Sequence, residues 1–250
     1  MPYRPPRYVH STGFFNRLAA HWRSRIGAHQ AWAAGILAGA MLAAAPNAMA
    51  QPAAAAPLPL RLMVIGDSLT AGFGLPLEQS FPSQLQAALR RKGHNVTVLN
   101  AGVSGDTTAG GKARLGWALA DKPDAVILEL GANDGLRGID PKDIHANLSA
   151  MLTTLKARGI PVFLSGMFAP PNLGDAYGKE FRAVYTRLAR EFDVPLQTFF
   201  LDGVVMKREL NQADGFHPNA AGVAVIVEKI LPQLEPWLSA MGRPAPQANR

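Results

Sequence analysis

The chain has 250 residues, enough for one α/β domain of roughly 200 residues with a sizeable core. It carries 25 Lys and Arg against 18 Asp and Glu, a net charge of +7, but residues 1–50 hold five arginines and no acidic residue, which leaves +2 for residues 51–250. This near balance argues against a nucleic-acid-binding face, and the absence of cysteine excludes disulfides, a thiol nucleophile and thiolate metal sites.

The first fifty residues have the pattern of a secretory signal peptide. An arginine-bearing segment precedes an apolar run over residues 31–45, and Ala48-Met49-Ala50 fits the small-residue pattern of a cleavage site. Because the apolar run is shorter than the roughly 20 residues that a membrane-spanning helix needs, we expect cleavage before Gln51 and no stable membrane span afterwards. The alternative is an uncleaved anchor. The leader therefore predicts an exported protein.

Residues 51–250 divide into a spacer, one domain and a tail. Residues 51–59 are rich in Ala and Pro and are typical of a spacer, and residues 239–250 are typical of a flexible tail. Short apolar runs between them predict strands over residues 60–65, 96–100, 125–130, 161–166 and 195–199. Apolar residues at helical spacing predict helices over residues 144–155, 181–192 and 223–234. Apolar strands that alternate with helices predict a parallel sheet covered on both faces, an α/β fold in one domain over residues 60–238.

Polar residues follow the predicted strands where each strand ends. Ser68 comes three residues after the first strand, residues 102–106 follow the second, and residues 131–134 follow the third. Asp214 and His217 lie after the fifth strand and before the last helix. Open parallel sheets bind ligands outside the carboxyl ends of their strands, so we expect these four loops to meet at one edge.

Ser68, His217 and Asp214 have the residue types of a serine hydrolase. A serine hydroxyl becomes a good nucleophile when a neighbouring base takes its proton. His217 is the candidate base, and Asp214 is the candidate acceptor that fixes the imidazole tautomer and stabilises the imidazolium. The alternative is ordinary turn chemistry at Ser68 and Asp214, with His217 a surface residue before a proline.

Attack on a carbonyl places negative charge on its oxygen, which hydrogen-bond donors must stabilise. The candidate donors are the side-chain amide of Asn133 and the backbone N–H groups of Gly105 and Ser68. The alternative is that Gly105 is a turn glycine and Asn133 a helix cap. Local hydrogen bonds are the expected role of Asp67 and Asp106.

Four segments together resemble the four sequence blocks of the SGNH (GDSL) hydrolases, in the same order. They are Gly66-Asp67-Ser68-Leu69, Ser104-Gly105-Asp106, Gly131-Ala132-Asn133-Asp134 and Asp214-Gly215-Phe216-His217. The chain is most similar to the periplasmic thioesterase I/protease I/lysophospholipase enzymes and to bacterial arylesterases, which implies a periplasmic location. The resemblance implies a flavodoxin-like three-layer α/β/α sandwich with a five-stranded parallel sheet. It also implies that Ser68 is the nucleophile, that Asp214 and His217 complete the triad, and that Gly105 and Asn133 are oxyanion-hole donors.

Apolar residues in the loops after the first and fourth predicted strands are candidates for the substrate pocket. They are Phe73, Leu75, Met167, Phe168 and Pro170. Apolar residues in loops are less expected than in strands, so they indicate an acyl or aryl site. The alternative is packing at the edge of the domain. In the resembling enzymes the loop after the fourth strand lines the acyl channel, which favours the first interpretation.

The predicted activity is hydrolysis of acyl esters or thioesters through an acyl-enzyme. The expected partner is a small-molecule or lipid-type acyl ester, and we expect a monomer with no metal or other cofactor, since no metal or phosphate-binding motif is present. Two alternatives are a polysaccharide O-acetyl esterase and a non-catalytic binding module. The module is disfavoured because it would not need to keep Ser, Asn, Asp and His together, although a fold alone decides no function.

Overall fold

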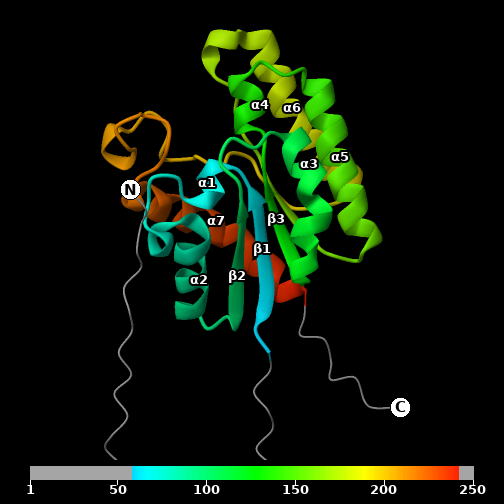
Figure 1. Ribbon diagram of the computed structural model, residues 1–250, viewed down its shortest axis with the longest axis vertical. Coiled ribbons are helices and arrows are strands. Elements are labelled where there is room, and N and C mark those ends of the chain that lie inside the picture. Colours follow the sequence, from blue (N-terminus) through cyan, green and yellow to red (C-terminus); the bar gives the residue numbers. More distant parts are fainter. Residues whose placement is uncertain (1–57, 242–250) are drawn as a thin grey trace, which may run out of the picture. The chain divides into compact units, whose positions relative to one another are not determined.

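The computed structural model describes residues 58–241 (Figure 1). The predicted leader lies outside the described residues, as do almost all of the predicted spacer and most of the predicted tail. The last helix continues to Ala240, into the first residues of that tail. In the described part of the chain no helix is both long enough and apolar enough to cross a membrane.

A parallel sheet of five strands forms the centre of the fold, as the sequence predicts. The strands are β1 (Leu60–Gly66), β2 (Val96–Gly102), β3 (Ala125–Glu129), β4 (Val162–Ser165) and β5 (Leu196–Gln197), in the order β2-β1-β3-β4-β5. β5 is shorter than expected. Its hydrogen bonding to the neighbouring segment nevertheless continues past the strand, because the N–H of Phe200 donates to the carbonyl of Gly166 at 2.9 Å.

Helices cover both faces of the sheet, which makes a three-layer α/β/α sandwich (Figure 1). α2 (Phe81–Arg91) packs against α7 (Ala220–Ala240), and α5 (Pro141–Ala157) packs between α3 (Thr108–Ala118) and α6 (Asp175–Phe192). Two short helices, α1 (Ser68–Ala71) and α4 (Ala132–Leu136), follow β1 and β3 directly. Single 3-10 turns complete the fold at Leu77–Gln79, Leu119–Asp121, Pro171–Leu173 and Arg208–Leu210. The layers leave the loops at the carboxyl edge of the sheet free to build a site.

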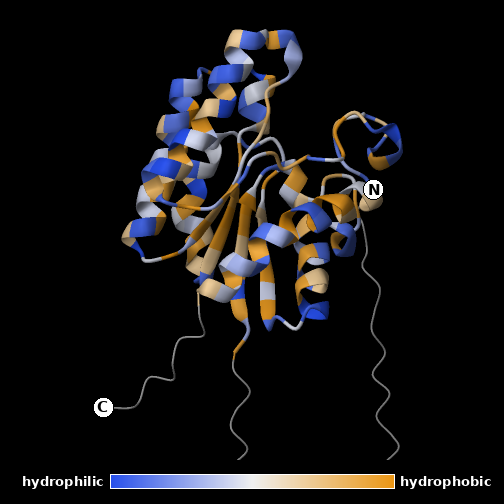
Figure 2. Ribbon diagram, turned by 180° about the vertical axis from the view of Figure 1, so that it is seen from behind, coloured by the Kyte–Doolittle hydropathy of each residue, from blue (hydrophilic) through white to orange (hydrophobic). Residues whose placement is uncertain are grey.

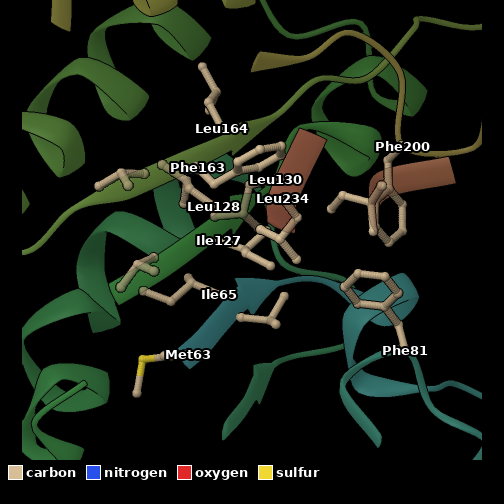
Figure 3. Close-up of a cluster of buried hydrophobic side chains, with 14 of the residues drawn as sticks. Met63, Ile65, Phe81, Ile127, Leu128, Leu130, Phe163, Leu164, Phe200 and Leu234 are labelled. Carbon is tan, nitrogen blue, oxygen red and sulfur yellow. The ribbon is translucent and has the colours of Figure 1, made fainter. Parts of the chain in front are cut away.

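The core lies between the sheet and its helices (Figure 3). The residues of β3 and β4 are all buried, which explains their nearly continuous apolar sequence. Phe81 of α2 meets Phe200 edge-on at 4.9 Å between ring centroids, and Phe163 of β4 meets Trp237 of α7 at 5.5 Å. Figure 2 shows the resulting pattern, with apolar strands inside and polar outer surfaces on the helices. Each large apolar side chain buried here stabilises the fold by about 1.5–3 kcal/mol, so the strand ends are firmly placed.

Candidate active site

The candidate site lies at the carboxyl end of β1, where the chain first crosses to β2 on one side of β1 and later to β3 on the other side. β1 pairs with β2 on one side and β3 on the other, and the chain runs from Ser68, after β1, to Asn133, after β3. In open α/β sheets such a switch point opens a crevice outside the carboxyl ends of the strands. The fold thus brings the two segments to adjacent strand ends.

A tight turn presents Ser68 at the end of β1. Asp67 is the N-cap of α1, and its Oδ1 accepts a hydrogen bond from the N–H of Leu69 at 2.9 Å. A side chain at position 66 would collide with Thr70 and Glu129, so only glycine lets the strand turn this closely. The glycine therefore allows the compact turn that exposes the hydroxyl of Ser68.

His217 connects Ser68 to Asp214. Its Nε2 lies 3.0 Å from the Oγ of Ser68, and its Nδ1 lies 2.7 Å from the Oδ2 of Asp214. The second oxygen of Asp214 accepts the N–H groups of Phe216 at 2.9 Å and His217 at 3.0 Å. The backbone N–H of His217 contributes most to lowering the pKa of Asp214 to about 2, followed by the N–H of Phe216 and the imidazole. The carboxylate therefore stays charged and holds the imidazole with a proton on Nδ1, which leaves Nε2 free to accept the proton of Ser68.

Gln212 holds the histidine loop independently of Asp214. Its backbone N–H donates to the carbonyl of His217 at 2.8 Å, and its side-chain amide donates to the carbonyls of Phe73 at 2.7 Å and Pro218 at 3.0 Å. Through Phe73 the loop is tied to the segment after α1, and the Phe73 ring lies 4.6 Å from the imidazole, measured between centroids. The sequence gives no sign of this role for Gln212, because its partners are backbone carbonyls, one of them distant in the chain.

The candidate oxyanion donors come from three loops. Ser68 begins α1, and N–H groups in the first turn of a helix have no acceptor within it. Gly105 is exposed and has a φ of +84°, a conformation that favours glycine. The amide of Asn133 donates to the carbonyl of Asp106 at 2.9 Å and to the carboxylate of Asp67 at 3.2 Å. The Asn133 side chain is thus held beside the residues that flank Ser68 and Gly105.

Two buried carboxyl groups lie behind the serine turn. Burial is the main cause that raises the pKa of Asp67 to about 6, against the hydrogen bond from Leu69. Glu129 is fully buried at the end of β3 and accepts the hydroxyl of Thr70 at 2.8 Å. Burial, and then the charge of Asp67, raise the pKa of Glu129 well above its ordinary value. These groups support the turn from behind, and the charge of His217 acts on Asp67 to lower its pKa in part.

Asp134 also serves the site from a distance. Its carboxylate accepts the N–H of Thr108 at 2.8 Å and the hydroxyl of the same residue at 2.6 Å. The sequence position suggests that it helps to begin its own helix, α4, but the side chain binds the start of α3 instead. It thereby joins the loop after β3 to the helix that follows the Gly105 loop.

The predicted substrate residues have different surroundings. Phe73 is 49% exposed beside the imidazole, and Leu75 is partly buried against the core. Phe168 is 37% exposed, with its ring stacked on Phe199 at 4.1 Å. Pro170 is half-buried before the 3-10 turn Pro171–Leu173, whereas Met167 is a core residue that is only 3% exposed. Met167 therefore packs under the loop, because it follows β4 so closely that its side chain still faces the interior.

Within the described residues no cluster of His, Asp and Glu is arranged to hold a metal ion. The chemistry available at this edge of the sheet is that of a hydroxyl, an imidazole, a carboxylate and hydrogen-bond donors. Such a set can transfer an acyl group to Ser68 and release it to water.

Comparison with known proteins agrees with this geometry. Residues 64–225 match the model of the GDSL-like Lipase/Acylhydrolase family. This chain belongs to that family. The match runs from β1 into α7 and so includes every segment that contributes to the site.

Named relatives of this GDSL-like hydrolase are esterases and thioesterases. An arylesterase of Vibrio mimicus is 43% identical over 180 residues, 72% of this chain and 84% of the relative. The thioesterase 1/protease 1/lysophospholipase L1 of Escherichia coli K12 is 39% identical over 179 residues, 71% of this chain and 85% of the relative. The crystal structure of the psychrotrophic esterase EstA from Pseudoalteromonas, inhibited by monoethylphosphonate, superposes with a TM-score of 0.68 at 32% identity, over 72% of this chain and 98% of that one. The GDSL-like hydrolase described here is thus an esterase of the SGNH type.

Proposed function

We propose that this esterase hydrolyses carboxylic and thio esters through an acyl-enzyme on Ser68. The observation that carries the proposal is the continuous hydrogen-bonded line from Asp214 through His217 to the Oγ of Ser68, with contacts of 2.7 and 3.0 Å. This is the connectivity that a nucleophile, its base and the group that orients the base require. Names of relatives that include arylesterase and thioesterase support the substrate class.

The reaction has two halves. In the first, the Oγ of Ser68 attacks the ester carbonyl while the Nε2 of His217 takes its proton, and the carbonyl oxygen becomes an oxyanion. The N–H groups of Ser68 and Gly105 and the amide of Asn133 stabilise that oxygen. The imidazolium returns its proton to the departing alcohol or thiol, and the acyl group stays on Ser68. In the second half His217 takes a proton from water as the resulting hydroxide attacks the acyl carbon, the bond from that carbon to the Oγ of Ser68 breaks, and the imidazolium returns its proton to Oγ as the free acid leaves.

One N–H of the Asn133 amide must exchange its acceptor to take part. In the free enzyme it donates to Asp106 and Asp67. The bond to Asp67, at 3.2 Å, is longer than the 2.9 Å bond to the carbonyl of Asp106. We infer that the oxyanion replaces the Asp67 contact, while the Asp106 carbonyl keeps the amide in place.

The acyl chain of the substrate lies between the loops after β1 and β4 in this proposal. Phe73 and Phe168 are exposed aromatic side chains on these two loops, and Leu75 and Pro170 lie beside them in sequence. Exposed apolar side chains next to a polar reaction centre suit a substrate with an apolar acyl or aryl group. We infer that the loop over residues 167–178 sets the acyl-length preference.

We further propose that the enzyme is exported to the periplasm as a monomer. The support for export is the signal-peptide pattern of residues 1–50 and the cleavage pattern before Gln51. A mass spectrum of the protein from the producing cell is expected to show a chain that begins near Gln51. A chain that retains residues 1–50 would contradict processing.

The central test is hydrolysis of a series of p-nitrophenyl esters, from acetyl to long acyl, by the parent protein and by Ser68→Ala. We expect activity in the parent that falls at least about 10³-fold in the variant, because the nucleophile is lost. The chain-length optimum then separates lipid-type substrates from acetyl groups, the substrates of an O-acetyl esterase. Equal activity in both proteins would remove Ser68 as nucleophile, whereas no activity in either protein would favour a non-catalytic binding module.

A further inference from the structure

Arg114, on α3, carries a largely buried charge that the proposed mechanism does not use. Its side chain is 17% exposed and forms an ion pair through Nε with the carboxylate of Asp106, which is 15% exposed. Its Nη2 donates to the carbonyl of Gly66 at 2.9 Å, and its Nη1 is buried with no hydrogen-bond partner among the described residues. Burial of a guanidinium with an unsatisfied nitrogen is unfavourable for stability, so its contacts call for another explanation.

The two residues that Arg114 binds, Asp106 and Gly66, lie next to or hold the candidate oxyanion donors. Asp106 follows Gly105 directly, and the carbonyl of Asp106 accepts the amide of Asn133 at 2.9 Å. Gly66, the second group, precedes Ser68 by two residues at the end of β1. One planar guanidinium therefore joins the loop that holds two donors to the strand end that holds the third donor and the nucleophile.

The local sequence of α3 is adapted to this contact. Gly110 lies in the first turn of the helix, and a Cβ there would come within 2.5 Å of the Oδ1 of Asp106. Glycine disfavours helix formation, so its presence here is explained by the close approach of the Asp106 carboxylate. Helical side chains lean toward the N-terminus, which directs Arg114, one turn later, back to the same carboxylate.

We propose that Arg114 is a positioning residue for ester hydrolysis, which fixes the Gly105 and Asn133 donors relative to Ser68. This inference rests on the proposed function of the same site. The fork geometry of the Arg114 guanidinium is essential, because this one group binds a side-chain carboxylate in a loop and a backbone carbonyl at a strand end. A lysine has a single donor centre and cannot hold both partners in the same geometry.

The test measures kcat and KM of Arg114→Lys and Arg114→Met on p-nitrophenyl butyrate. We expect kcat to fall about 10- to 100-fold in Arg114→Met, and less in Arg114→Lys, while KM changes by less than about twofold, because the donors act on the transition state and not on the bound ester. An alkylboronic acid forms a tetrahedral adduct on the serine that needs the same donors. Its inhibition constant is expected to rise in step with the loss of kcat, whereas inhibition by the product acid stays the same.

The matched control is Arg90→Met. Arg90 is also a helical arginine whose Nε donates to a backbone carbonyl, that of Val96 at 2.9 Å, but at the opposite end of the sheet. We expect its kcat and boronate inhibition to equal those of the parent. If Arg114→Met does not fold, Arg114→Lys alone decides between the outcomes.

A double-variant cycle with Asn133→Ala separates positioning from general stability. If Arg114 acts through the donors, substitution of Arg114 lowers kcat by a smaller factor in the Asn133→Ala background than in the parent. The inference would be overturned if the factors by which the two substitutions lower kcat simply multiply in the double variant. It would also be overturned if Arg114→Lys and Arg114→Met both have the kcat of the parent. Failure of the proposed function is a different result: Ser68→Ala would then retain the activity of the parent.

Discussion

Replacement of Asp214 by asparagine is expected to damage the enzyme more than its replacement by alanine. The two backbone N–H groups of Phe216 and His217, at 2.9 and 3.0 Å, require an oxygen at the Oδ1 position. An asparagine side chain must therefore turn its NH₂ group toward the Nδ1 of His217. That group can only donate, so Nδ1 must be an acceptor, and the ring proton moves to Nε2. The imidazole then faces Ser68 with a proton and cannot remove another.

The magnitude follows from the exposure of the carboxylate. In a fully enclosed triad the same substitution costs about 10⁴ in rate. The side chain of Asp214 is 38% exposed, so water relieves part of the constraint, and we expect a loss of about 10³ in kcat/KM, or about 4 kcal/mol in the barrier. Alanine leaves Nδ1 open to water, which can accept its proton and keep the productive tautomer in part. For Asp214→Ala we expect a loss of about 10².

The assay is kcat/KM on p-nitrophenyl butyrate near neutral pH for the parent and both variants, together with their thermal unfolding. The unfolding midpoint of Asp214→Asn is expected to stay close to that of the parent, because Gln212 holds the histidine loop and the amide oxygen keeps both backbone hydrogen bonds, whereas that of Asp214→Ala is expected to fall because the two N–H groups lose their acceptor. Tautomer control predicts the order parent, alanine, asparagine. An asparagine variant that is as active as the alanine variant, or more active, would show that Asp214 does not control the tautomer of His217.

Two further predictions concern groups beside the triad. Glu129 keeps its proton in the folded state over a pH range in which the unfolded chain releases it, so the free energy of unfolding falls as pH rises above about 4.5. Glu129→Gln is expected to reduce this fall in the free energy of unfolding, measured by urea unfolding from pH 5 to pH 8. A fall as large as that of the parent would show that the carboxyl ionises freely. Phe168→Ala removes an exposed ring stacked on Phe199 and is expected to shift the preferred acyl length in the p-nitrophenyl ester series, with little effect on acetyl ester, and an unchanged length profile would separate this loop from acyl binding.

The sheet could be predicted from the sequence because burial on both faces leaves a continuous apolar signal. β1, β3 and β4 each contain only buried residues in their inner part, and all five strands fall within the predicted runs or extend them by at most two residues. α3 gave no comparable signal. Its glycines, Gly110, Gly111 and Gly116, weaken both helix propensity and the apolar stripe, and the first two are required by close packing against Asp106 and Leu130.

The residues of the candidate site also fall into those that the sequence could indicate and those that it could not. The candidate reactive residues lie in short motifs, Ser68 and Asn133 just after strands and His217 just before α7, so their types and positions make them candidates, and the resemblance to the SGNH hydrolases supplies their expected roles. Residues that hold them, such as Gln212 and Arg114, bind backbone carbonyls and a carboxylate brought near by the fold. Every residue has a backbone carbonyl, so no sequence motif indicates which side chain binds a particular one.

The distance along the chain between the nucleophile and its base has a consequence for protein synthesis. Ser68 and His217 are hydrogen-bonded across 149 positions, and α7 follows directly after the histidine loop. A growing chain emerges with Ser68 first, so for most of translation it holds a serine turn without a base. With Ser68 and His217 in their proposed roles, the site is completed only when the histidine loop has been made and has packed, so a nascent chain that ends before His217 lacks the base for ester cleavage.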